Sequence, residues 1–475
     1  MYTSNMAFVP SSILSRRITP KQLNNVIFNK LQPVCYRSTA ALPKEMPPCD
    51  FKPEPYKGIS KTNALKIKQL NLNPAIMNYY KNPVMIHQGY MQYLYDTDGE
   101  RYLDLFGGIV TVSVGHCHPK VLARATDQMQ KLWHTTNIYL HPTIHEYAEK
   151  LTSKLPGNLK IVYFTNSGSE ANDLALFMAR MYTGTYDTMN PDPYRGPWGG
   201  ANCRNSVSQT YRSCDCAPGE CNAGKLYLDQ LEDVLRFSMP KGRVGALFAE
   251  SIQGVGGAVQ YPKNYIKSAF EKIRARGGVC ISDEVQTGFA RLGTHFWGFE
   301  THDVIPDIVT MAKGMGNGFP LAAVVTTPEI ASCMGQALHF NTFGGNPISC
   351  AVGSAVLDVI EDEKIQEKAD VNGTYFIKEL MKLQKEFDCV GDVRGKGFMI
   401  GVELVKDMTS HEPMSAEDIG QIWEDIKDMG VLVGKGGVYG NVLRVKPPMC
   451  ITRDDIDFSM AVIRKALENH NKKKN

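Results

Sequence analysis

The sequence predicts an α/β protein whose large domain is a mostly parallel sheet with helices on both faces, beside a smaller α+β domain. Two observations carry this prediction. Helical patterns and helix-rich segments dominate the chain after about Ser354, with only short strands such as 399–403. Before that point, helical patterns alternate with short Val- and Ile-rich runs, which is typical of parallel strands joined by helices. These runs lie at 161–164, 244–250, 279–283, 308–311 and 322–325.

An aromatic-rich hairpin is predicted before these strands. The alternating residues 90–96 lead into the turn residues Asp98 and Gly99, and a second run follows at 102–105. We expect residues 41–115 to form an N-terminal segment that completes the small domain. Residues 116–353 then form the large domain, and 354–475 the C-terminal small domain.

Composition points to a small-molecule partner. The chain has 475 residues, 43% of them hydrophobic, which suits an ordinary globular protein. Its formal net charge of +3 gives no electrostatic reason to expect nucleic acid or an anionic membrane as a partner. No apolar run approaches the roughly 20 residues that cross a bilayer.

Residues 1–40 resemble a mitochondrial transit peptide. Basic residues and hydroxyl side chains are frequent there, and the first acidic residue of the chain is Glu45. A flexible basic tail is the alternative interpretation. The expected location is the mitochondrial matrix, where thiols stay reduced, so the twelve cysteines are expected to be free.

Ligands of parallel sheets bind beyond the carboxyl ends of the strands, so the loops after the strands are the candidate sites. After the run at 161–164, Ser167, Gly168 and Ser169 open a helical pattern at 174–182. Free N–H groups at such a helix start bind a phosphate. A simple helix cap is the alternative interpretation.

Asp283 ends the run at 279–283, and Val285 follows two residues later. Because side chains alternate along a strand, both point to the same side and together suit a flat heterocycle. The carboxylate would hold a proton on a ring nitrogen, and valine would pack on the ring face. An acid that caps the following helix is the alternative.

Lys313 follows the run at 308–311 and precedes the glycine-rich residues 314–318. A lysine is rarely buried without a partner, and desolvation lowers its pKa as imine formation requires. The glycine spacing does not fit a dinucleotide-binding fingerprint. Two further candidates are the turn-rich loop 339–347 and Arg444, an arginine in an apolar strand that is expected to pair with a carboxylate.

Together these segments resemble the class III aminotransferases, from about Pro74 to the C-terminus. The resemblance implies fold type I, pyridoxal 5'-phosphate as cofactor, and amino acid and 2-oxo acid substrates. It makes Lys313 the residue that binds the cofactor as a Schiff base and Asp283 the partner of the ring nitrogen. It places Val285 on the ring, Gln286 on the ring hydroxyl, and Ser167, Gly168 and Ser169 on the phosphate. Thr342 would reach the phosphate of a neighbouring subunit's cofactor, which implies a homodimer or homotetramer with the site at the subunit interface, and Arg444 would bind the substrate carboxylate.

Within this family, 194–200 and 341–347 resemble mitochondrial members that move an amino group between alanine or related amino acids and glyoxylate or pyruvate. One departure stands against this. Family members carry a strand and an aromatic-His-Gly loop after the helix that ends near Gly184, and here the segment near 185–193 looks shortened. An impaired form that lacks this cofactor-stacking segment is therefore one alternative function. A pyridoxal-phosphate-dependent lyase for amino-alcohol phosphates is the other.

No metal site is predicted. The cysteines at 203, 214, 216 and 221 have spacings that fit no common zinc pattern.

Overall fold

The computed structural model describes residues 44–73, 78–136, 138–183, 222–238, 244–337 and 339–474. All of them belong to one compact unit, Ala41–Asn475. The expected transit peptide, the segment near 185–193 and the cysteines at 203–221 lie outside the described residues.

A five-stranded sheet with the strand order β4-β10-β9-β8-β5 is formed by strands between residues 161 and 326. β5, β8 and β9 are parallel, while β10 runs antiparallel to both of its neighbours, so β10 alone opposes the common direction. The sheet is therefore mostly parallel, and the predicted fold class is confirmed. The strands are β4 (Ile161–Thr165), β5 (Ala246–Glu250), β8 (Val279–Asp283), β9 (Ile308–Met311) and β10 (Ala322–Thr326).

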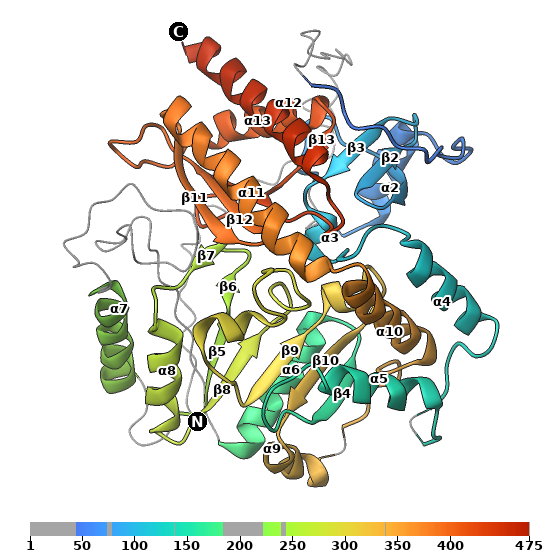
Figure 1. Cartoon of the computed structure of the whole chain (residues 1–475), viewed down its shortest axis with the longest axis vertical. Helices are drawn as coiled ribbons and strands as arrows, with labels where there is room; N and C mark the ends of the chain where they lie inside the picture. The colour runs from blue at the N-terminus through green and yellow to red at the C-terminus, as the bar shows by residue number, and fades with distance from the viewer. Residues whose placement is uncertain are drawn as a thin grey trace, which may run out of the picture. The chain divides into compact units, whose positions relative to one another are not determined.

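Helices cover both faces of this sheet, because side chains alternate between the faces along each buried strand. Ile308 and Ala322 pack with α6 on one face, whereas Val309 and Ala323 share a core with α5 and α10. α8 lies against β5 and β8, with α7 beside it (Figure 1). These helices are α5 (Pro142–Thr152), α6 (Gly168–Tyr182), α7 (Asn222–Asp233), α8 (Tyr265–Arg274) and α10 (Pro347–Asp362).

The predicted hairpin is confirmed as β2 (Tyr93–Asp96) and β3 (Arg101–Asp104), with β1 (Ile86–Tyr90) paired to β2. β13 (Val431–Leu432) pairs in parallel with β3, which joins the N-terminal strands to the C-terminal part of the chain. A separate antiparallel sheet has the order β11-β12-β15-β14. Its strands and the nearby helices are β11 (Val390–Lys396), β12 (Met399–Leu404), β14 (Gly434–Gly436), β15 (Val442–Val445), α11 (Ile365–Glu386), α12 (Ala416–Asp428) and α13 (Arg453–Lys474).

Several helices begin at residues whose side chains cap the free backbone N–H groups. Ser167 caps α6, and Asn346 caps α10, where Pro347 takes the first helical position. No helix within the described ranges is both long and apolar enough to cross a bilayer. The remaining elements are α2 (Lys61–Asn71), α3 (Gly107–Val110), α4 (Pro119–Met129), the π-helix η2 (Val234–Ser238), β6 (Ile252–Gln253), β7 (Val259–Gln260), α9 (Pro328–Ser332) and the 3₁₀ turns η3 (Gly298–His302), η4 (Lys313–Gly316) and η5 (Cys333–Gln336).

Candidate active site

Asp283 is the last residue of β8, and two hydrogen bonds hold its carboxylate. The backbone N–H of Val285 donates to Oδ1 at 2.9 Å, and Asn172 Nδ2 in α6 donates to Oδ2 at 3.0 Å. Burial raises the pKa of Asp283, while these two bonds and the nearby charge of Lys313 act in the opposite direction. The carboxylate is thus fixed at the edge of the sheet where ligands of such folds bind.

Lys313 follows β9 at the same edge of the sheet. Its φ of 48° lies in the left-handed region that few residues other than glycine adopt. Its Nζ makes no hydrogen bond or ion pair with any described residue, although Asp283 and Glu250 attract it over a longer distance. Burial lowers the pKa of Lys313 despite these acids, and Arg444 adds to the effect. A partly buried lysine with these properties is suited to covalent attachment of a carbonyl group.

Ser167, Gly168 and Ser169 form the start of α6, next to the segment that follows β8. The Ser167 hydroxyl accepts a hydrogen bond from the backbone N–H of Glu170 at 3.2 Å. A Cβ on Gly168 would lie 3.1 Å from Val285 Cγ1, so glycine allows this close approach. The first N–H groups of a helix have no partner inside it, and they attract an anion. Helix capping by Ser167 and anion binding at this point are therefore compatible.

Glu170 connects the start of α6 to the loop that carries Thr342. Its Oε2 accepts from the backbone N–H of Asn166 at 3.1 Å and from Asn341 Nδ2 at 2.9 Å. Burial acts to raise the pKa of Glu170, but the hydrogen bonds from Asn341 and Asn166 outweigh it and lower that pKa. Thr342 itself is exposed, as is the neighbouring Phe343. The structure thus brings this loop to the helix start and leaves Thr342 accessible to a second molecule.

Arg444 and Lys446 both donate to the side-chain oxygen of Gln286. Arg444 Nη2 lies 3.3 Å and Lys446 Nζ lies 3.1 Å from Gln286 Oε1. The two cations are two residues apart at the end of β15, so they point to the same side of the strand. The Arg444 guanidinium lies 5.3 Å from the ring centre of Phe106. Burial lowers the pKa of Arg444.

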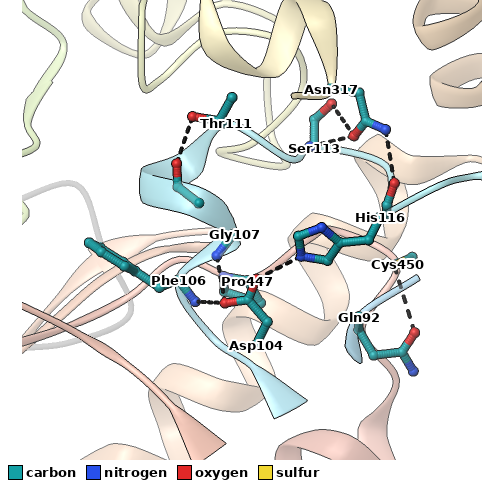
Figure 2. A network of polar contacts seen from close by, with 12 residues as sticks. Gln92, Asp104, Phe106, Gly107, Thr111, Ser113, His116, Asn317, Pro447 and Cys450 are labelled. Carbon is teal, nitrogen blue, oxygen red and sulfur yellow. Dashed lines mark hydrogen bonds and ion pairs between the residues drawn. The ribbon is translucent and has the colours of Figure 1, made fainter. Parts of the chain in front are cut away.

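A network of polar contacts holds the loop after β3 against the loop of Lys313, as Figure 2 shows around Asn317. Asn317 Oδ1 accepts from the backbone N–H groups of Ser113 at 2.8 Å and Val114 at 2.9 Å. Its Nδ2 donates to the Gly115 carbonyl at 2.8 Å. The Ser113 hydroxyl donates to the carbonyl of Gly314 at 2.7 Å. Gly314, the residue after Lys313, is therefore hydrogen-bonded to Ser113, which lies 201 positions earlier in the chain.

Asp104 anchors the other end of the same loop. Its Oδ1 accepts from the backbone N–H groups of Phe106 at 2.8 Å and Gly107 at 2.9 Å. Its Oδ2 lies 2.8 Å from Nε2 of His116, and the two side chains face each other in Figure 2. The loop from Asp104 to His116 is thus held at both ends before it meets Asn317.

A cavity of about 760 Å³ opens beside Asp283, between α6 and β5. Asn172 and Glu250 line it together with Asp283, whereas Lys313 and Gln286 do not. Burial raises the pKa of Glu250. The volume suits a small molecule. Of the cofactor-binding residues predicted from the sequence, however, only Asp283 lines this cavity.

Polar groups in this region lack partners within the described ranges. Asn172 Oδ1 and Arg444 Nε are buried without a hydrogen bond, and Lys313 Nζ is likewise unpaired. Buried polar groups are normally hydrogen-bonded. A planar, anionic group with a carbonyl suits these residues. Its carbonyl could react with the amine of Lys313, its anionic part could bind at the start of α6, and its ring could contact the unpaired polar atoms. The residues present therefore fit pyridoxal phosphate.

Asn172, Glu250 and Lys446 were not among the residues predicted from the sequence. Asn172 is four residues after Gly168 on the same helix face, so the helical spacing carried a signal for it. No pattern pointed to Lys446, because its hydrogen-bond partners lie 192 and 160 residues away in the chain.

The described residues contain no group of three or more His, Cys, Asp or Glu side chains that could hold a metal ion. The cysteines within the described ranges form no disulfide with one another; they are Cys49, Cys117, Cys280, Cys333, Cys350, Cys389 and Cys450.

Comparison with known proteins gives one consistent family. The sequence profile of class-III aminotransferases matches residues 76–192 and 204–467. Human mitochondrial alanine–glyoxylate aminotransferase 2 is 52% identical over 462 aligned positions, covering 90% of each chain. The alignment is 462 positions long, whereas 90% of the 475 residues of this chain is a smaller number of residues. The alignment therefore contains gaps, which are positions where the human protein has a residue and this chain has none.

Solved structures agree with the sequence relatives. An Arthrobacter phospholyase in complex with phosphoethanolamine is 32% identical, with a TM-score of 0.75 over 85% of this chain and 99% of that one. An amine transaminase from an uncultivated Pseudomonas species, solved in its pyridoxal-phosphate-bound form, is 28% identical with a TM-score of 0.70. The match to the latter covers 84% of this chain and 98% of that one.

Proposed function

Because the chain belongs to the class III aminotransferase family and is a pyridoxal-phosphate-dependent transferase, we propose that its amino donor is alanine or a related amino acid and its acceptor glyoxylate or pyruvate. The substrate proposal is supported by the 52% identity to human alanine–glyoxylate aminotransferase 2. The observation that carries the proposed site is the unpaired, partly buried Lys313 beside Asp283 at the carboxyl end of the sheet.

Each predicted residue takes one role in this proposal. Lys313 holds the cofactor, and Asp283 accepts a hydrogen bond from its ring nitrogen. Val285 packs on the ring and Gln286 contacts the ring hydroxyl. Ser167, Gly168 and Ser169 bind the phosphate at the start of α6, where free N–H groups face outward. Arg444 binds the substrate carboxylate through its guanidinium.

The bound cofactor supplies an electron sink for the bond that breaks at the substrate Cα. The residues of the chain do the rest. Once the substrate amine has released Lys313 from the cofactor, the freed Nζ would accept the Cα proton and return it, and burial lowers the pKa of this lysine in the direction that favours such a base. Asp283, fixed by Val285 and Asn172, keeps the ring nitrogen protonated. Arg444 orients the substrate so that its Cα–H bond faces Lys313.

The test is the visible absorbance of the purified protein with pyridoxal phosphate, before and after alanine is added. We expect a bound-cofactor band that alanine abolishes and that Lys313→Ala lacks. The matched control is Lys267→Ala, which changes an exposed lysine of α8 and should leave the band unchanged. A band retained by Lys313→Ala would contradict the assignment of Lys313.

The phospholyase alternative is favoured by one observation, the likeness to the Arthrobacter enzyme solved with phosphoethanolamine. We give it second place because the identity is lower, 32% against 52% for the human aminotransferase. Incubation with phosphoethanolamine decides between them. Release of inorganic phosphate would favour the lyase, whereas keto acid formation from alanine and glyoxylate without phosphate release supports the transaminase.

An impaired form remains the second alternative. The family profile leaves residues 193–203 unmatched, and the human relative has positions that this chain lacks. The cavity between α6 and β5 lies beside Asp283, where a missing strand and loop would leave room. A cofactor band that does not respond to alanine would support this alternative, and rapid bleaching by alanine would overturn it.

We further propose a mitochondrial matrix location and assembly into a homodimer or homotetramer. The location is supported by the basic residues 1–40 and by the mitochondrial relatives. Deletion of 1–40 should abolish import in a mitochondrial fractionation experiment. Assembly is supported by the exposed Thr342, which would reach the phosphate of the neighbouring subunit's cofactor.

A further inference from the structure

Lys446 is a fully buried lysine that the proposed reaction does not use. Its Nζ donates hydrogen bonds of 3.1 Å to the Gly254 carbonyl and to Gln286 Oε1. It forms no salt bridge with a carboxylate of the described residues, which is unusual for a buried lysine. Burial lowers the pKa of Lys446 well below its ordinary value, and the charge of Arg444 adds to the effect. Because burying the Lys446 amine costs free energy, we expect this amine to contribute to the structure of its surroundings.

The hydrogen bonds of Lys446 determine which way the Gln286 amide faces. An amide side chain presents an acceptor oxygen on one side and an NH₂ donor on the other, and turning it over changes its shape very little. Lys446 and Arg444 offer donors only, and both are within hydrogen-bond distance of Oε1. The reversed orientation would set the NH₂ group against two cations. The oxygen therefore faces the cations, and Nε2 faces away from them.

Close packing confines the same amide. A Cβ on Gly254 would lie 2.4 Å from its carbon, nitrogen and oxygen atoms, so the backbone of Gly254 is in direct contact with it. Lys446 donates to the carbonyl of this same residue, and the N–H of Gly254 donates to Glu250 Oε2 at 2.8 Å. Lys446 thus holds both the amide and the backbone that packs against it. The Nε2 group makes no hydrogen bond with a described residue.

We infer that Lys446 is a positioning residue, which fixes the Gln286 amide so that its NH₂ group donates to the ring oxygen of the bound cofactor. This inference rests on the proposed role of Gln286. It also connects the cofactor contact to the substrate contact, because Arg444 donates to the same oxygen. Lys446 itself is too deeply buried to touch the substrate.

The test is a double-mutant cycle on the holoenzyme, with the dissociation constant of pyridoxal phosphate and the visible absorbance maximum as readouts. Lys446→Met keeps the length of the side chain and removes its donors. We expect it to weaken cofactor binding about ten-fold and to shift the absorbance maximum, because it removes a buried hydrogen bond to the Gln286 amide. In a Gln286→Ala background the same substitution should change neither readout, since the amide that Lys446 orients is gone.

Lys396→Met is the matched control, because Lys396 is a half-buried lysine of β11 whose pKa burial also lowers. It should bind cofactor as the unmodified chain does. Thermal unfolding of each cofactor-free variant separates misfolding from a binding defect. If Lys446→Met does not fold, a crystal structure of the holoenzyme decides, and an Nζ to Oε1 distance beyond hydrogen-bond range would overturn the inference.

The outcomes distinguish the inference from the proposed function. An equal loss of affinity in both backgrounds would overturn the inference alone, because Lys446 would then act on the fold and not through Gln286. A chain that binds no pyridoxal phosphate, or binds it independently of Lys313, would overturn the proposed function and the inference with it.

Discussion

At the scale of single residues, Gly254 shows how little free space surrounds the Gln286 amide. A Cβ at this position would meet the amide at 2.4 Å, a distance that real contacts do not reach. Gly254→Ala should therefore displace Gln286 and weaken pyridoxal phosphate binding about ten-fold, at an overpacking cost of about 1–3 kcal/mol. Cofactor titration and urea unfolding measure the two effects.

The control for Gly254→Ala is Gly420→Ala in α12, where an added Cβ would meet no atom within 4 Å. This change should leave cofactor binding intact and raise the free energy of unfolding by up to about 1 kcal/mol, as expected for alanine in a helix interior. Wild-type cofactor affinity in Gly254→Ala would show that the amide has more room than the structure gives it.

Residues at strand ends could be predicted from the sequence, and their partners could not. Asp283 and Lys313 each follow an apolar run directly, so the general rule for parallel sheets identified them. Lys446 also ends a strand, but an isolated lysine beside prolines looks like any surface lysine. Its burial becomes evident only when β15 meets the segments of Gly254 and Gln286.

At the scale of elements, Asn317 fastens the loop of Lys313 to the loop after β3. Asn317→Ala would leave the N–H groups of Ser113 and Val114 without an acceptor. Each buried unpaired group costs about 1–3 kcal/mol, so for the two groups we expect the free energy of unfolding to fall by about 2–6 kcal/mol. The cofactor should also dissociate faster, because η4 loses its support. Urea unfolding and a cofactor off-rate check these outcomes.

Part of that loss would come from the backbone, since Asn317 has a φ of 47°. Asn264→Ala controls for this contribution, because Asn264 has a φ of 65° and its side chain makes no capping hydrogen bond. It should cost about 1–2 kcal/mol, the ordinary penalty for a left-handed residue that is not glycine or asparagine. Equal losses in the two variants would mean that the Asn317 side chain contributes nothing.

The sequence predicted where the strands begin and end better than it predicted whether each strand runs parallel or antiparallel to its neighbours. The strands begin and end within two residues of the predicted apolar runs, because burial on both faces leaves an unbroken hydrophobic pattern. That pattern is the same for either strand direction. β9 ends at Met311 and β10 begins at Ala322, a connection too short for a helical crossover, and the antiparallel pairing follows from this.

At the scale of the whole molecule, an exposed apolar surface adjoins Thr342 and supports the proposed assembly. Phe343, the next residue in the chain, is 60% exposed, and the ring of His134 lies 5.5 Å from that of Phe343. Large exposed apolar patches of soluble proteins mark interaction sites. Phe343→Glu would place a charge in such an interface and should shift the protein toward the monomer in analytical ultracentrifugation, with loss of bound cofactor.

Val371→Glu is the comparison, because Val371 is a 50% exposed apolar residue of α11. It should sediment as the unmodified chain does. A Phe343→Glu protein that keeps both its mass and its cofactor would remove the reason to place the interface at this surface.

The pairing of β3 with β13 has a consequence for the order of events during synthesis. The N-terminal strands meet their partner only after residue 431 exists, and the ion pair between Lys44 and Asp457 spans 413 positions. At about 5–20 residues per second, a ribosome takes on the order of tens of seconds to cover such a distance. During that time the edge strand β3 lacks its partner strand β13 and could pair with a strand of another polypeptide. A chaperone that shields this edge during synthesis should therefore raise the yield of folded protein more than one that acts after the chain leaves the ribosome.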